Sequence, residues 1–324
     1  MTERSAVGWL RNRFTAERLN RLLPVPRGAD APSVRTAIVT DSAAGLLPEW
    51  TEPAEARGWF AVVPLSIMAG DEIFSDGPEA VAALGIALAA GRPVRTSRPA
   101  PGLFERVYRE LAQAGYGGIV SIHLSGALSG TADAARLAAD RVGVPVHVVD
   151  TRSAGLAEGF AVQAAAAAAA AGDDADGVLA ALRGALEGAE VRFFLPSLEQ
   201  LRRGGRIGAA ASWVGTVLSI KPLLAIRDGQ IVPIERIRTS ARALPRLREL
   251  SVADARRRLS PRLAVHYFGN RGEADELARE LSDELGGDAD VTVSPLPAVL
   301  AAHTGLGVLA IVVSGAPLTG AEGP

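Results

Sequence analysis

The fold is decided by the stretch IVSIHLSGALSGTAD, residues 119–133. Its opening run, 119–124, is rich in β-branched residues and predicts a short strand. A turn of small and hydroxyl-bearing residues follows, and the alanine-rich segment 132–141 has the apolar spacing of a helix. Strand, small-residue turn and helix in this order form the repeating unit of an α/β protein.

The same alternation extends to both sides of this stretch. Short apolar runs predict further strands at 34–40, 60–65 and 144–149, and the segments between them predict helices at 81–90 and 102–114. Continuous apolar strands separated by amphipathic helices favour a mainly parallel sheet with helices on both faces.

After residue 150 the pattern indicates a second, mixed α/β sheet. The runs 220–226 and 231–238 flank Asp228-Gly229, a dipeptide typical of a β-hairpin. The remaining patterns predict helices at 156–171, 174–187, 240–259 and 272–286, and strands at 191–195, 262–268, 290–294 and 307–313. We therefore divide the chain into an N-terminal extension and linker at 1–33, an N-terminal α/β domain at 34–155 and a C-terminal α/β domain at 156–318.

The composition excludes several classes of protein. The 34 Lys and Arg residues nearly balance the 36 Asp and Glu residues, so the sequence lacks the excess of basic residues that is typical of a nucleic-acid-binding protein. No cysteine is present, which excludes disulfides, thiolate metal sites and a cysteine nucleophile. The charged start, 1–20, lacks the apolar core of a secretion signal, and the longest apolar run, 160–171, is too short to cross a bilayer. We expect a cytoplasmic protein that is not an integral membrane protein.

The turn after the first quoted strand is a candidate anion site. It contains Ser125, Ser129 and Gly130, and it leads directly into a helix. Backbone N–H groups and hydroxyls at the positive end of a helix suit a carboxylate or a phosphate, and open α/β sheets bind ligands beyond the carboxyl ends of their strands. Ordinary helix capping by Ser129 or Thr131 is the alternative interpretation.

Three further segments carry polar side chains in unusual settings. Thr96 lies in a hydroxyl-bearing turn before prolines, where a helix cap is the alternative. Arg206 ends the basic turn LRRGGRI, 201–207, which suits an anion but equally suits a solvated surface. His303 is followed by glycines at 305 and 307, which leave room for a ligand to approach.

Several common catalytic motifs are absent from the sequence. It has no nucleophile elbow, no Walker sequence and no dinucleotide-binding glycine pattern after the first strand. No pair of its four histidines has metal-ligand spacing, so we expect no metal and no cofactor.

In their order along the chain, these segments resemble the DegV family. The matching segments are TAIVTDS at 36–42, VVPLS at 62–66, Asp76-Gly77, Thr96-Ser97, LSGALSGT at 124–131, GGRI at 204–207, IKPLL at 220–224 with Asp228-Gly229, and His303 with its glycines. They are spread from residue 34 to residue 313, and the ordered set is far more specific than any one segment.

The resemblance implies a lipid-binding protein that is not itself an enzyme. Members of the DegV family bind a long-chain fatty acid in a tunnel between two α/β domains, and some present it to a separate fatty-acid kinase in phospholipid metabolism. By this resemblance Thr96, Ser129 and His303 would hold the carboxylate, and Ser125 and Gly130 would lie close enough to contribute. Transient membrane contact would accompany the uptake of such a ligand.

The resemblance assigns Arg206 a separate role, on the phosphate or kinase-facing side of the site. Two other functions stay open at this point. One is a phosphotransferase or hydrolase acting on a small acyl or phosphorylated substrate in the inter-domain cleft. The other is an interaction module that uses Arg202, Arg203 and Arg206 only to dock a partner.

Overall fold

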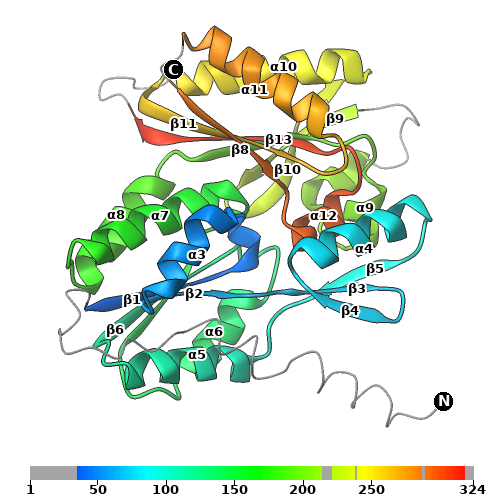
Figure 1. Cartoon of the computed structure of the whole chain (residues 1–324). Coiled ribbons are helices and arrows are strands. Elements are labelled where there is room, and N and C mark those ends of the chain that lie inside the picture. The colour runs from blue at the N-terminus through cyan, green and yellow to red at the C-terminus, as the bar shows by residue number, and fades with distance from the viewer. Residues whose placement is uncertain (1–34, 214–220, 238, 287–288, 318–324) are drawn as a thin grey trace.

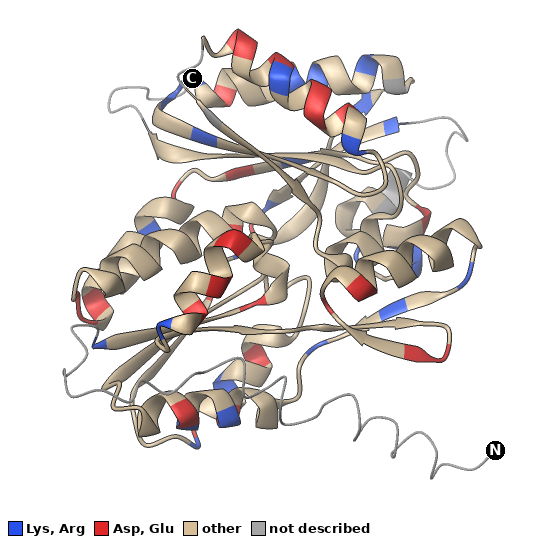
Figure 2. Ribbon diagram, in the orientation of Figure 1, with Lys and Arg blue, Asp and Glu red and all other residues tan. Residues whose placement is uncertain are grey.

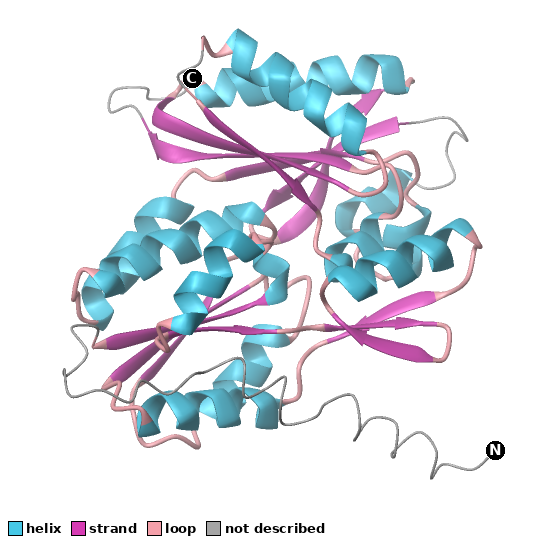
Figure 3. Cartoon of the chain, in the orientation of Figure 1, coloured by secondary structure: helices cyan, strands magenta, loops and turns pink. Residues whose placement is uncertain are grey.

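The computed structural model describes residues 35–213, 221–237, 239–286 and 289–317. The predicted N-terminal extension and linker, 1–33, lies outside the described residues. Two main sheets are stacked with helices between and outside them, as Figure 3 shows. Charged residues are frequent on the helices outside the second sheet (Figure 2).

The first sheet is fully parallel and has the strand order β2-β1-β6-β7. Its strands are β1 (Thr36–Asp41), β2 (Phe60–Val63), β6 (Gly118–His123) and β7 (Val146–Asp150). All six residues of β1 are buried, which agrees with a strand covered on both faces. The parallel sheet predicted for this half is therefore confirmed.

Helices cover both faces of this sheet. They are α3 (Pro48–Ala56), α5 (Pro101–Gln113), α6 (Thr131–Ala139), α7 (Leu156–Ala170) and α8 (Ala175–Leu186). Figure 1 shows α5 and α6 on the outer face, and α7 and α8 between the two main sheets. The buried alanines of α7 allow this close packing, because a methyl side chain keeps the backbone near its neighbours.

The second sheet is mixed, with the strand order β10-β9-β8-β13-β11-β12. Its strands are β8 (Glu190–Phe194), β9 (Lys221–Arg227), β10 (Gln230–Ile237), β11 (Arg258–Tyr267), β12 (Asp290–Pro295) and β13 (Leu309–Pro317). The β9–β10 hairpin predicted around Asp228-Gly229 is confirmed. Two helices, α10 (Ser240–Ala255) and α11 (Arg271–Glu284), cover the outer face of this sheet (Figure 1).

A third, small antiparallel sheet was not predicted. It has the order β4-β3-β5 and consists of β3 (Ser66–Ala69), β4 (Glu72–Ser75) and β5 (Val94–Ser97). Each strand has four residues, which is too short for the alternation of apolar and polar residues to be distinctive. Two helices lie beside it, α4 (Pro78–Ala89) and α12 (Ala298–Thr304), and α9 (Glu199–Arg203) packs against α12 (Figure 1).

Helix α7 belongs to two hydrophobic cores. Its first turns place Leu156 and Phe160 in a core shared with the second sheet, whereas Ala161 and Ala165 lie in the core of the first sheet. Helix α8 packs in the core of the first sheet as well. The predicted division at residue 155 stays a prediction, and the shared packing of α7 and α8 with the first sheet favours a division after α8.

A buried histidine joins the second sheet to the start of α7. The N–H of Leu156 donates to Nε2 of His266 at 2.9 Å, and Nδ1 of His266 lies 3.3 Å from the Ser294 carbonyl oxygen. Gly155 has φ +63° and a Cβ there would lie 3.0 Å from His266, so this approach favours glycine. Burial lowers the pKa of His266 to about 4, so the ring is neutral at pH 7.

We predict that the stabilising effect of His266 weakens in acid. The pKa of His266 is about 4 in the folded protein, and its unperturbed value is 6.5. Between these values the unfolded chain binds more protons than the folded one, so the stability of the protein decreases as the pH is lowered. The destabilisation caused by His266→Gln should shrink by roughly 2 kcal/mol between pH 7 and pH 5. Urea unfolding of both proteins at the two pH values measures this difference, and equal destabilisation at both would contradict it.

Candidate ligand-binding site

A cavity lies between the first and second sheets, beyond the carboxyl end of β6. It has a volume of about 190 Å³, measured as the space open to the centre of a water molecule. One water needs roughly 10–15 Å³ of this measure, so the cavity holds on the order of a dozen water-sized groups. This is the size of an extended chain of carbon atoms rather than of a single small anion.

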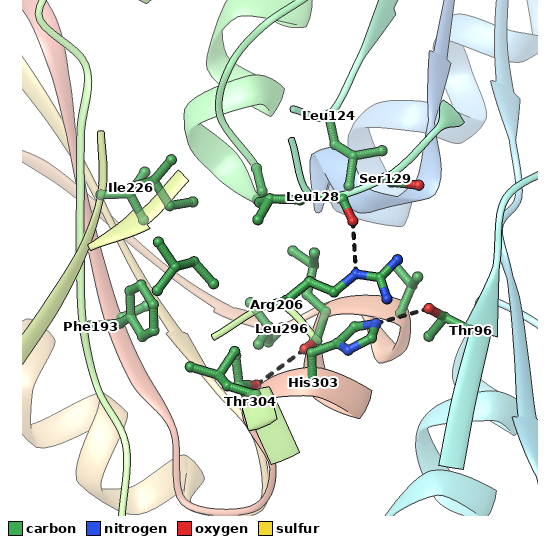
Figure 4. Close-up of a pocket in the computed structure, with 18 of the residues that line it drawn as sticks. Thr96, Leu124, Leu128, Ser129, Phe193, Arg206, Ile226, Leu296, His303 and Thr304 are labelled. Atoms are coloured by element: carbon green, nitrogen blue, oxygen red, sulfur yellow. Dashed lines mark hydrogen bonds between the residues drawn. The ribbon is translucent and has the colours of Figure 1, made fainter. Parts of the chain in front are cut away.

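Most of the cavity wall is apolar, and both halves of the chain contribute to it. The first half supplies Leu65, Leu124 and Leu128. The second half supplies Val191, Phe193, Leu201, Ile226, Ile231, Leu296, Val299, Leu300, Val308 and Ala310. Ile226 and Ile231 flank the hairpin turn, and Figure 4 shows Ile226 and Phe193 on the side of the second sheet. An apolar occupant would be enclosed by side chains of both sheets.

Polar groups gather at one end of the cavity. Strand β5 supplies Thr96 and helix α12 supplies His303, and Oγ1 of Thr96 lies 2.8 Å from Nε2 of His303 (Figure 4). Ser129 and Gly130, at the start of α6, line the same end. The hydroxyl of Ser129 is 2.8 Å from that of Thr131, and α6 has no side-chain cap, so the capping alternative does not describe this turn.

His303 is held as a neutral ring in this setting. Burial, followed by the nearby positive charge of Arg206, lowers the pKa of His303 to about 4. Its Nδ1 is buried and has no hydrogen-bond partner among the described residues. If Nε2 donates to Thr96, the Thr96 hydroxyl hydrogen stays available, and if Thr96 donates, Nδ1–H does. Nδ1 is packed against Gly204, so the Thr96 hydroxyl of the first arrangement is the donor that a ligand can reach.

The three arginines of the basic turn have different surroundings. Arg202 and Arg203 are exposed, and both pair with Glu199, at 2.9 and 2.7 Å. Arg206 instead lines the cavity, where Nε donates to the Leu128 carbonyl at 3.0 Å (Figure 4). Its Nη1 donates to the Gly204 carbonyl at 2.6 Å. The solvated-surface interpretation therefore fits the first two arginines, and Arg206 alone reaches the polar end.

Ser125 serves a different contact from the one predicted. Its hydroxyl is buried and donates to the Gly229 carbonyl at 2.7 Å, so it ties the β9–β10 turn to the turn before α6. Arg152 and Asp228 form an exposed ion pair across the same junction at 3.0 Å. Ser125 does not line the cavity. Its hydroxyl links the two halves of the chain away from the cavity, and the geometry gives no support to its predicted contact with a carboxylate.

Helix α12 is held by a residue from the first half of the chain. Oδ1 of Asp76 accepts a hydrogen bond from the N–H of Ala298 at 2.9 Å, and Oδ2 accepts one from the Ser42 hydroxyl at 2.9 Å. Burial raises the pKa of Asp76 to about 6. Because α12 carries His303, this cap helps to position the histidine ring opposite Thr96.

A second polar network lies under the first sheet and is fully buried. It runs from Asp41 to His123 at 3.0 Å, from His123 to Ser121 at 2.7 Å and from Ser121 to Tyr108 at 2.7 Å. The order of an acid, a histidine and a serine is that of a hydrolytic triad. All four side chains are buried and none lines the cavity, so the network joins the sheet to α5.

Three polar residues of the site were not predicted. Arg98, Thr304 and His266 all line the cavity. Arg98 stands two residues after Thr96 in the same predicted turn, so its spacing was a usable signal. His266 lies in the predicted strand 262–268, and only the tertiary packing of β11 against the start of α7, through the hydrogen bond from Leu156, places it at the cavity.

A model of the family described as "Uncharacterised protein, DegV family" matches residues 35–315. This chain belongs to the DegV family. The resemblance stated from the sequence is therefore confirmed. Its two-domain α/β fold class is confirmed as well, because solved DegV structures share it.

Relatives of this DegV chain match it over nearly their whole length. A DegV domain-containing protein of Streptomyces coelicolor is 44% identical over 285 residues, which are 87% of this chain and 99% of the relative. A structure described as fatty acid binding of a DegV family protein from Thermus thermophilus is 32% identical, has a TM-score of 0.78, and matches 87% of this chain and 99% of its own.

A third relative supports the same fold. A structure described as DegV, a fatty acid binding protein from Bacillus subtilis, is 29% identical, has a TM-score of 0.78 and shows the same coverage of both chains. Within the described residues of the DegV chain, no helix is both long and apolar enough to cross a bilayer. The described part of the chain also holds no cluster of three or more His, Asp or Glu side chains suited to a metal ion.

We predict that Gly204→Ala disturbs His303 without unfolding the protein. Gly204 has ordinary helical backbone angles, so alanine fits the backbone, but its Cβ would collide with Nδ1 of His303. The variant should keep the wild-type circular dichroism and lose ligand affinity roughly tenfold, as the Thr96 contact is displaced.

Gly85→Ala on α4 is the matched control. A Cβ at that position meets nothing within 4 Å, so this variant should gain roughly 0.5–1 kcal/mol of stability and keep its affinity. If Gly204→Ala bound ligand as tightly as Gly85→Ala, the close packing at His303 would be irrelevant to binding.

Proposed function

We propose that this protein binds a single long-chain fatty acid, with the tail in the apolar part of the cavity and the carboxylate at Thr96, Ser129 and His303. The observation that carries the proposal is the form of the cavity, which is apolar along its walls and polar at one end. The relatives from Thermus thermophilus and Bacillus subtilis, described as fatty acid binding proteins, support the same ligand class.

The two parts of the cavity would contribute differently to affinity. A tail of about 16 carbons, buried at about 0.8 kcal/mol per CH₂, would supply most of the favourable free energy. The head group would mainly set the orientation, because few polar groups are placed at its end of the cavity. Gly130 would contribute its backbone beside Ser129.

The polar end is suited to binding rather than to catalysis. Thr96 and His303 are as close as a nucleophile and its base, but an active base is normally oriented by a third group. Nδ1 of His303 has no such partner among the described residues. A pKa of about 4 also makes the ring a weak base at neutral pH. These features disfavour the phosphotransferase or hydrolase alternative.

We further propose that a separate fatty-acid kinase phosphorylates the bound carboxylate, and that Arg206 faces the transferred phosphate. Guanidinium binds phosphate oxygens well, and Arg206 is already oriented by two backbone carbonyls. In this proposal the protein is a cytoplasmic carrier in phospholipid metabolism, and it contacts a membrane only transiently to exchange its ligand.

Simultaneous Thr96→Ala and Ser129→Ala substitutions test the head-group site. Each hydrogen bond to a charged group contributes roughly 1.5–3 kcal/mol, so palmitate affinity should fall at least tenfold while the thermal unfolding curve is retained. Displacement of a fluorescent fatty acid measures the affinity. Native mass spectrometry of the wild type should reveal co-purified fatty acid, and wild-type protein that stays empty after incubation with palmitate would refute the proposed function.

Arg206→Ala separates binding from transfer. Because the carboxylate is assigned to the Thr96 end, the affinity of this variant for palmitate should stay within about threefold of the wild-type affinity. A change of that size corresponds to the loss of one weak, screened contact. Formation of acyl phosphate by ATP and a bacterial fatty-acid kinase should fall much further. Exposed Arg203→Ala serves as the charge-matched control, since its partner is Glu199. A large loss of palmitate binding would assign Arg206 to the carboxylate instead.

A further inference from the structure

Arg98 is an arginine at the polar end that the proposed function leaves without a role. It lines the cavity together with Arg206, although its side chain is exposed. No acidic residue is part of the described cavity wall. Within the described residues, Arg98 also forms no ion pair with a carboxylate. The two guanidinium groups therefore give this end an unbalanced positive charge.

Both arginines are placed against the same short turn. Nε of Arg206 donates to the Leu128 carbonyl at 3.0 Å. The Arg98 side chain packs against Gly130, where a Cβ would be 2.6 Å from its Nη1 and 3.2 Å from its Cδ. Gly130 thus provides the space for the Arg98 side chain, which any larger residue would displace. The turn 128–130 therefore contacts both guanidinium groups, Arg206 at the residue before Ser129 and Arg98 at the residue after it.

The position of Arg98 favours a bound anion. Gly130 is the N-cap of α6, a helix of nine residues, and the N-terminal end of a helix carries partial positive charge. A cation there is disfavoured, whereas an anion between the cation and the helix end is attracted by both. His303 is neutral at pH 7 and adds no charge to this end of the cavity.

We propose that Arg98 is a specificity-determining residue that makes the site prefer a doubly charged phosphate head group over a carboxylate. The inference rests on the proposed function, because the apolar cavity must accept the same tail in both cases. Thr96, Ser129 and His303 can bind either head group, since a carboxylate and a phosphate both present oxygen acceptors. A phosphate monoester carries more charge and more acceptor oxygens, so it gains more from a second planar guanidinium.

The test compares two ligands with the same tail, palmitate and monohexadecyl phosphate, at pH 8. In the wild type, the phosphate ester should bind more tightly than palmitate. Arg98→Gln should weaken hexadecyl phosphate roughly tenfold, because one charged hydrogen bond is lost, and palmitate by no more than about threefold. The ratio of the two affinities is the measured quantity.

Arg95→Gln is the matched control, because it removes the same charge from the same strand. Arg95 is exposed and precedes Thr96 on β5, so its side chain leaves the opposite face of the small sheet and does not line the cavity. This variant should leave the affinity ratio at its wild-type value. If it changed the ratio as much as Arg98→Gln, the effect would be a general loss of charge and the proposal would be overturned.

Two further readouts separate direct contact from a structural effect. The second ionisation of a phosphate monoester lies near pH 6, so the deficit of Arg98→Gln should shrink when the titration is repeated below that pH. It should also shrink at high salt, since exposed charges are screened. A ratio unaltered by Arg98→Gln while palmitate still binds would refute this inference alone. Wild-type protein that binds neither ligand would refute the proposed function.

Discussion

The arrangement of the binding site depends on the hydrogen bonds that Asp76 accepts from the N-terminus of α12. This contact joins residues 222 positions apart and is partly buried. A seven-residue helix cannot hold itself in place by its own backbone bonds, so this cap and the packing of its buried residues against α4, α9 and the small sheet decide where its far end lies. His303 stands at that far end, and its distance to Thr96 follows from these contacts. The Ser42 hydroxyl in turn holds Asp76, which connects the site to the end of β1.

The electrostatics of the cavity follow from burial in the same region. The low pKa of His303 keeps the ring uncharged, and the described wall contains arginines but no carboxylate. An anionic head group would therefore meet only donors and positive charge at one end and hydrocarbon elsewhere. Under the proposed function this combination would orient a fatty acid, since the tail and the head group would each have a single suitable environment.

Much of the secondary structure was predictable because it depends on local pattern. The strands β1 and β6 and the β9–β10 hairpin are marked by apolar runs and by turn residues. The small sheet was not predictable, because its four-residue strands gain stability only from α4 and α12 packed beside them. Helix α10 also ends four residues earlier than its pattern suggests, because β11 begins at Arg258 and pairs with β13.

The sequence by itself determined the fold class and the family, because their motifs follow one another in a fixed order along the chain, and it pointed to Thr96, Ser129, Gly130, Arg206 and His303 as candidates for the site. The tertiary structure alone decided which hydroxyls and guanidinium groups face the cavity. Ser125 and Ser129 stand four residues apart in one turn, yet Ser125 bonds Gly229 and Ser129 lines the cavity. Arg203 and Arg206 differ in the same way. The direction of a side chain in a turn depends on backbone angles and on distant partners, and neither is written in local sequence.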